Sequence, residues 1–192
     1  VGYQQIQGDQ YAALYSETLT VELENDFLPF LYPNQYVNFS PDSGASKLAL
    51  SMVSEDTADV DALKQIYNYV VNNLTYDYDK AQTVETGYLP DVDETLSTKT
   101  GICFDYAALT TAMLRSCDIP CKLQIGYTGD IKHAWIDVYI RSKGWVTGAV
   151  SFKGDSWSLM DPTFDSSADS DDSEAIQDYI GNADNYTVQF TR

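Results

Sequence analysis

The run from Cys103 to Ser116 constrains the fold of this chain more than any other part of its sequence. Alanine, leucine and methionine are frequent in it and neither glycine nor proline interrupts it, so we expect a helix that starts at about Cys103. Small and apolar residues cover more than one face of that helix: Ala107, Ala108, Leu109, Ala112, Met113 and Leu114. Such a helix is expected to be buried against a sheet. Asp118-Ile119-Pro120 ends it, because the residue before a proline avoids the helical conformation.

Strand-like segments follow this helix. They run from Cys121 to Tyr127, from His133 to Arg141 and from Gly144 to Thr147, with a further pair around Val150 and from Trp157 to Asp161. Glycine-containing turns separate them, as in an antiparallel meander. The order of elements therefore predicts an α+β fold in which a buried helix packs on an antiparallel sheet.

The rest of the chain is organised around this unit. Apolar residues recur at steps of three and four between Thr57 and Leu74, which predicts an amphipathic helix. Leu19 to Leu23 and Gln35 to Phe39 alternate as half-buried strands do, and Asp77 to Thr98 has the composition of a long surface connection near a site. The acidic run from Asp165 to Glu174 is expected to be a solvated loop before a short helix that ends at Ile180. We divide the chain into an N-terminal helical and strand extension packed on the core (residues 1–56) and a core domain (residues 57–192).

Composition argues against several classes of function. Twenty-nine acidic and 11 basic side chains give a formal net charge of −18, which repels nucleic acid and anionic membrane surfaces. No apolar run reaches the roughly 20 residues of a membrane span, so we expect no membrane insertion. The chain begins at Val1 rather than Met, and we expect that an upstream segment carried any targeting signal. The expected upstream segment, the few lysines and the high charge together favour a secreted or cell-surface bacterial protein.

Cys103 is the strongest candidate for a chemical role. At a helix start, unpaired backbone N–H groups and the positive end of the helix dipole stabilise an anion, so we expect a thiol pKa below the usual value of about 8.5. The same N–H groups can donate to an oxyanion when a carbonyl carbon is attacked there. Cys117 ends the same helix and Cys121 begins a strand, so both are expected to be structural.

His133 is the single histidine of the chain, so any cysteine–histidine pair must contain it. It opens a strand on the face opposite Ala134, where we expect the imidazole to be accessible. Asp137 lies about 13 Å along the same strand, at roughly 3.3 Å per residue, and cannot reach the ring. Asp161, at a strand end before Pro162, is the best candidate to orient the imidazole, although an aspartate before proline is also common in turns.

Four motifs in this order resemble the core of the transglutaminase-like superfamily: Gly101 to Tyr106, Arg115 with Ile119-Pro120 and Gly126, His133-Ala134-Trp135 with Gly144-Trp145, and Asp161-Pro162-Thr163. The resemblance covers about Asp61 to Thr163. It implies a papain-like fold and a catalytic triad of Cys103, His133 and Asp161. It also implies that Tyr76, or a backbone N–H near Cys103, completes the oxyanion hole, and we expect Trp135 to contribute to the same oxyanion and substrate-binding region.

The resemblance implies cysteine-dependent acyl transfer or amide hydrolysis through a thioester, without a metal or other cofactor. Peptides or proteins, cell-wall peptide among them, are the expected substrates. Cys117 and Cys121 depart from the family pattern, and a disulfide between them across the helix exit is conceivable.

Two rival interpretations come from other classes of protein. Three cysteines and one histidine would complete a zinc site, but Cys103 and Cys117 are separated by about 20 Å of helix at 1.5 Å per residue. The second rival is a non-catalytic domain that binds peptide or cell-wall material through a tyrosine-rich surface, since the chain contains 15 tyrosines. We favour catalysis over binding alone because all the triad candidates are present.

Overall fold

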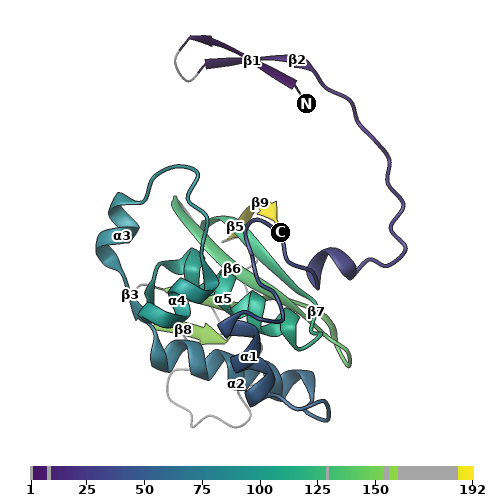
Figure 1. The fold of residues 1–192 in the computed structure, drawn as a ribbon, viewed down its shortest axis with the longest axis vertical. Coiled ribbons are helices and arrows are strands. Elements are labelled where there is room, and N and C mark those ends of the chain that lie inside the picture. The colour runs from purple at the N-terminus through teal and green to yellow at the C-terminus, as the bar shows by residue number, and fades with distance from the viewer. Residues whose placement is uncertain (1, 8–9, 129, 154–155, 160–185) are drawn as a thin grey trace.

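The structure is a computed structural model that describes residues 2–7, 10–128, 130–153, 156–159 and 186–192. Its centre is a five-stranded sheet with a layer of helices against it (Figure 1). Asp161, the acidic run from Asp165 to Glu174 and the expected helix that ends at Ile180 lie outside the described residues.

Helix α5 (Cys103–Ser116) is the buried helix, and every residue from Asp105 to Arg115 is buried. The sheet has the strand order β8-β7-β6-β5-β9, and all its pairings are antiparallel. Its strands are β5 (Cys121–Thr128), β6 (Ile131–Ile140), β7 (Gly144–Lys153), β8 (Ser156–Leu159) and β9 (Tyr186–Thr191). The predicted α+β architecture, a buried helix on an antiparallel sheet, is confirmed.

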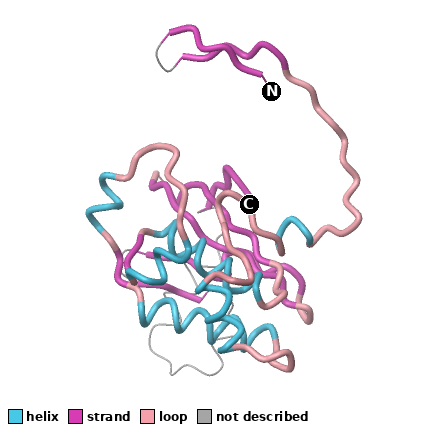
Figure 2. The backbone as a smooth tube through the Cα atoms, in the orientation of Figure 1, coloured by secondary structure: helices cyan, strands magenta, loops and turns pink. Residues whose placement is uncertain are grey.

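The core lies between α5 and one face of the sheet. Leu109 and Met113 of α5 share a buried cluster with alternate residues of β6, which are Ala134, Ile136, Val138 and Ile140. Burying one large apolar side chain contributes about 1.5–3 kcal/mol, so this contact fixes the helix on the sheet. Helix α2 (Asp59–Asn73) adds Leu63, Ile66 and Val70 to the same cluster. Helix α1 (Gly44–Met52) also contacts α5, and the helices lie together beside the strands (Figure 2).

The segment before the core contains a hairpin that the alternation pattern did not locate. Strands β1 (Gly2–Gln7) and β2 (Gln10–Tyr15) form an antiparallel pair that lies apart from the core in Figure 1. Neither Leu19 to Leu23 nor Gln35 to Phe39 forms a strand, so those predictions were wrong. Alternation only makes a segment compatible with a sheet, and Leu19 to Leu23 has no described partner strand.

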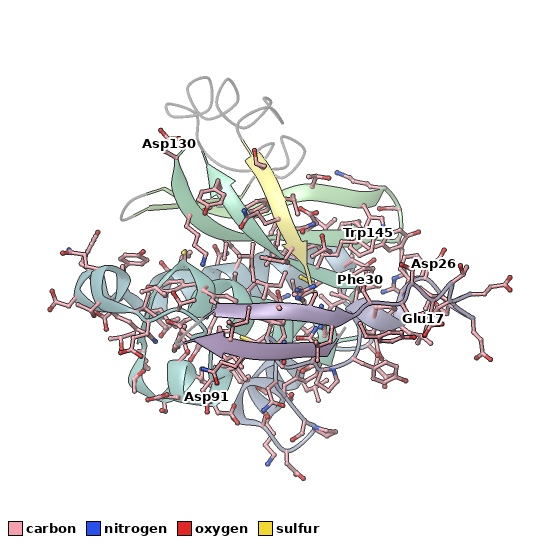
Figure 3. All side chains as sticks on the ribbon, turned by 90° about the horizontal axis from the view of Figure 1, so that it is seen from above. Glu17, Asp26, Phe30, Asp91, Asp130 and Trp145 are labelled. Atoms are coloured by element: carbon pink, nitrogen blue, oxygen red, sulfur yellow. The ribbon has the colours of Figure 1, made fainter. Side chains whose placement is uncertain are left out.

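Aromatic contacts join the chain to the core from Phe27 onward, just before the 3-10 helix η1 (Leu28–Phe30). The ring centroid of Phe27 is 4.5 Å from that of Tyr139. Phe30 and Trp145 lie side by side with ring centroids 5.5 Å apart (Figure 3). The division at residue 56 remains a prediction, since α1 already packs on α5 within the proposed extension.

Two short helices occupy the predicted connection between Asp77 and Thr98: α3 (Tyr78–Thr83) and α4 (Val92–Thr98). Asp77 accepts from the backbone N–H of Lys80, and Asp91 accepts from those of Asp93 and Glu94, so an aspartate caps each helix. Short strands β3 (Thr75–Tyr76) and β4 (Thr100–Gly101) pair in parallel on either side of this connection. Among the described helices, none combines the length and apolar character needed to cross a membrane.

Candidate active site

Cys103 is the first residue of α5, and only Ile102 separates it from β4. The N–H of Asp77 donates to the carbonyl of Gly101 at 2.9 Å, and the N–H of Thr75 donates to that of Lys99 at 2.8 Å. These bonds bring the chain around Tyr76 alongside the start of α5. The sequence prediction that a cysteine opens this helix is confirmed.

The thiol of Cys103 lies against the peptide that joins His133 to Ala134. Burial raises the pKa of the Cys103 thiol. The N–H groups of Ala134, Phe104 and Cys103 are placed to donate to the sulfur and oppose that rise, but burial is the largest influence. The expectation of a lowered pKa was therefore wrong, because burial of the sulfur outweighs these N–H donors, although Cys103 as a residue is half-buried.

His133 precedes Ala134 in the strand that contacts the thiol. It lies on β6, paired with Gly126 of β5, and is 8% exposed, so the expectation of an accessible imidazole was also wrong. Burial lowers the pKa of His133 to about 4, which keeps the ring neutral at neutral pH. Its Nε2 atom is buried without a hydrogen-bond partner among the described residues. A neutral imidazole can act as a general base towards a protonated thiol, rather than as half of an ion pair.

Trp135, two residues further along β6, packs against the imidazole of His133. The ring of Trp135 stacks on that of His133, with centroids 6.2 Å apart and an interplanar angle of 17°. Trp135 is 1% exposed, so it presents no surface to a substrate in this structure and instead supports the imidazole from one side. Asp137 accepts from Nε2 of Gln124 at 2.6 Å, in agreement with its exclusion as the group that orients His133. Asp161, the proposed orienting residue, lies outside the described residues.

Tyr76 lies next to the nucleophile, where the resemblance to the family expects an oxyanion donor. Burial raises the pKa of Tyr76 to about 12, so the phenol keeps its proton. Its hydroxyl faces the backbone N–H of Cys103, and its ring meets that of Tyr78 edge-on with centroids 4.9 Å apart. The arrangement brings two donors, a phenol and a helix N–H, to one side of Cys103.

Sequence reasoning missed three residues behind the nucleophile. Asp105 is fully buried, and its carboxylate accepts from Nζ of Lys80 at 2.8 Å and from the hydroxyl of Tyr88 at 2.5 Å. The contacts span 25 and 17 residues along the chain, and no local pattern predicts them. The sequence did offer one signal. Asp105 is the third residue of a largely apolar helix, and a carboxylate that is buried there needs a hydrogen-bonding or charged partner.

The three cysteines are free thiols, so the conceivable Cys117–Cys121 disulfide is not formed in this structure. Cys121 is buried and its sulfur lies 3.5 Å from the hydroxyl of Thr111. No group of three or more histidine, cysteine or acidic side chains within the described ranges has the arrangement of a metal site.

Comparison with known proteins identifies the family of the chain. The family description "Transglutaminase-like superfamily" matches residues 46–162, which is more than half of the chain. A structure from Cytophaga hutchinsonii, described as that of a candidate cysteine protease, superimposes with a TM-score of 0.51 and 25% sequence identity, over 65% of this chain and 42% of that one.

Two curated relatives add to the comparison. The UPF0252 protein MJ1282 of Methanocaldococcus jannaschii is 40% identical over 62 residues, which are 30% of this chain and 18% of that protein. The kyphoscoliosis peptidase of Mus musculus is 24% identical over 136 residues, which are 65% of this chain and 18% of that protein. The chain thus spans about a fifth of the length of these curated relatives.

Proposed function

Because the chain belongs to the transglutaminase-like superfamily, we propose that it is a cysteine-dependent enzyme that attacks amide carbonyls of peptides or proteins. The observation that carries this proposal is the contact of the Cys103 thiol with the peptide between His133 and Ala134. It joins the predicted nucleophile, at a helix start, to the chain segment that carries the only histidine.

The proposed reaction forms a thioester on Cys103. His133 takes the thiol proton as the sulfur attacks the carbonyl carbon, and the carbonyl oxygen becomes an oxyanion near the hydroxyl of Tyr76 and the N–H of Cys103. When the carbon–nitrogen bond breaks, the imidazolium returns the proton to the leaving amine. Water or a second amine then attacks the thioester, which releases an acid or a new amide and regenerates the thiol. Asp161 is proposed to orient the imidazole.

The neutral state of both groups suits this mechanism. The raised pKa of Cys103 keeps the thiol protonated, and the lowered pKa of His133 keeps the imidazole able to accept that proton. Substrate would complete the site by placing a polar carbonyl beside them. Trp135 is proposed to position the imidazole rather than to bind substrate, since it is 1% exposed and stacks on His133.

The proposal can be tested with p-nitrophenyl acetate, an activated ester that can acylate the enzyme without recognition of a peptide. We expect the parent chain to release nitrophenolate repeatedly, and Cys103→Ala and His133→Gln to lose this turnover. Cys117→Ala, which removes a half-buried thiol at the other end of α5, serves as the matched control. Turnover that survives in Cys103→Ala would overturn the proposal. Acceleration by a primary amine, with the amide as product, identifies transfer, and acetate as the product identifies hydrolysis.

A second candidate function is peptide or cell-wall binding without chemistry. It is favoured by the buried Nε2 atom of His133, which has no partner among the described residues, and by the high pKa of the thiol. A chain that does not turn over the ester but binds a fluorescein-labelled peptidoglycan stem peptide equally well with and without Cys103→Ala would support this alternative.

A further inference from the structure

The buried carboxylate of Asp105 lies two residues after the nucleophile and is the centre of a closed hydrogen-bonded group. Its Oδ2 atom accepts from the backbone N–H of Ile102 at 2.8 Å and from Nζ of Lys80 at 2.8 Å. Its Oδ1 atom accepts from the hydroxyl of Tyr88 at 2.5 Å. The ammonium of Lys80 also lies 2.7 Å from the oxygen of Tyr88, so each of the three side chains contacts the other two.

The chain is built closely around this carboxylate. A Cβ atom on Gly101 would lie 2.6 Å from the Cβ atom of Asp105, so glycine is required where β4 passes the side chain. Asp105 is 0% exposed, and a carboxylate with that burial is tolerated when a cation and hydrogen-bond donors surround it. Lys80 supplies the cation, and its own side chain is 31% exposed.

The group also fixes helix α3 against the start of α5. None of the six residues of α3 is buried, so apolar packing contributes little to its position. Lys80 reaches inward from α3 and Tyr88 from the loop that follows it, and both end on Asp105. Because α3 follows Tyr76 directly, its position also determines where the Tyr76 hydroxyl lies beside Cys103.

Charge links the same group to the thiol. The groups that face Asp105 are Lys80, Tyr88, Tyr76 and Cys103. Burial is the largest cause of the raised pKa of Cys103, and the negative charge of Asp105 adds to it. Burial and the charge of Cys103 raise the pKa of Tyr76, to which Asp105 makes a smaller contribution. Lys80 neutralises that charge, and without Lys80 the thiolate would form beside an uncompensated carboxylate.

We propose that Lys80 and Tyr88 are positioning residues for the Cys103 nucleophile and act through Asp105. The proposal rests on the catalytic role proposed above for Cys103. It assigns to α3 and the following loop a role in setting the reactivity of the thiol, in addition to forming part of the surface beside it.

The test is the pH profile of Cys103 alkylation by iodoacetamide, followed by mass spectrometry of the modified peptide. Lys80→Met should move the midpoint upward by about one pH unit, which is about tenfold less thiolate at a pH below both midpoints. Lys80→Arg should restore the rate to within about twofold, because it keeps the cation. Lys47→Met is the matched control, since Lys47 pairs with Asp42 at an exposed site, and its profile should equal that of the parent.

Two further variants separate charge from loosening of the fold. Tyr88→Phe keeps the ring and removes one hydrogen bond to Asp105, so it should shift the midpoint upward by less than Lys80→Met does. Lys80→Met combined with Asp105→Asn removes both charges and should return the midpoint to the parent value or below. Equal midpoints in the parent and Lys80→Met, or a double variant as high as the single one, would overturn the proposal. If the proposed enzymatic function is wrong, the parent chain itself will show no ester turnover. That outcome is distinct from a failure of the positioning proposal.

Discussion

The thiol of Cys103 lies against the backbone N–H of Ala134, the residue that follows His133 in strand β6. This contact is one of several between helix α5 and the sheet, and the proposed chemistry depends on it. The helix supplies N–H donors to the sulfur, while the strand supplies an imidazole that burial holds neutral. Both groups therefore enter the proposed reaction uncharged.

The first prediction concerns the single histidine of the chain. Burial lowers the pKa of His133 to about 4, so its NMR resonance should not titrate between pH 8 and 5. The unfolded chain binds a proton at about pH 6.5, so acidification favours unfolding. Stability is at its full value above pH 6.5 and should fall by about 2 kcal/mol between pH 7 and pH 5.

Urea unfolding of the parent and of His133→Gln at these two pH values checks this expectation. The variant should lose the pH dependence in that interval, whatever its absolute stability. A histidine that titrates near pH 6.5 in the folded chain would show that the imidazole is solvated.

The second prediction concerns the thiol of Cys103. Its raised pKa places the midpoint of iodoacetamide alkylation above the value of about 8.5 for a free cysteine. The unfolded chain loses this proton first as the pH rises, so the thiol contributes stability below pH 8.5 that is lost at higher pH. Denatured protein provides the reference midpoint, and Cys103→Ser should weaken the alkaline loss of stability. A midpoint below 8.5 would mean that the helix start, rather than burial, dominates.

Helix α5 and the meander were predictable because they are long and strongly patterned. Every residue from Asp105 to Arg115 is buried, so this stretch of the helix has no exposed face, and alternation along β6 is continuous. Helices α3 and α4 were missed because they are too short, at six and seven residues, to show an apolar period, although Asp77 and Asp91 are typical N-caps. Strand β9 was missed as well, because its pairing with β5 joins distant parts of the chain.

Candidate residues for the site could be named from the sequence, but their environment could not. Cys103 and His133 could be chosen from helix position and from the presence of one histidine. Their protonation could not, because burial depends on how distant segments close over them, and it reversed the expected pKa direction of Cys103. The contacts of Asp105 with Lys80 and Tyr88 could not be predicted for the same reason, because they join residues that are far apart in the sequence.

The third prediction concerns Gly126, which pairs with His133 across the sheet. A Cβ atom there would lie 1.9 Å from the carbonyl oxygen of Thr187 in β9 and 3.0 Å from the Trp135 ring. Gly126→Ala should therefore cost about 1–3 kcal/mol of unfolding free energy, because the backbone has to shift. Gly44→Ala, where the nearest atoms would be 3.4 Å away, is the control and should be close to neutral. Equal stabilities of the two variants in urea unfolding would contradict the close approach of β9.

The fourth prediction concerns Arg115, which joins three separate parts of the chain. Its guanidinium donates to the carbonyls of Tyr32 at 2.8 Å, Cys121 at 2.7 Å and Arg192 at 2.9 Å. Arg115→Lys keeps the charge but cannot reach all three, so it should lose about 2–3 kcal/mol of stability. Arg115→Met should lose at least as much, since it leaves the buried carbonyls without this donor. Thermal or urea unfolding measures both, and a Met variant as stable as the parent would show that these bonds contribute nothing.

The most direct test of the central claim is to trap the acyl group on the enzyme. The parent chain is mixed briefly with p-nitrophenyl acetate, quenched in acid and digested, and each cysteine peptide is examined by mass spectrometry. Our account predicts a thioester-linked acetyl group on Cys103, none on Cys117 or Cys121, and a large loss of this modification in His133→Gln. Acetylation of Cys103 that is no faster than that of Cys117, or that is unchanged in His133→Gln, would contradict the account.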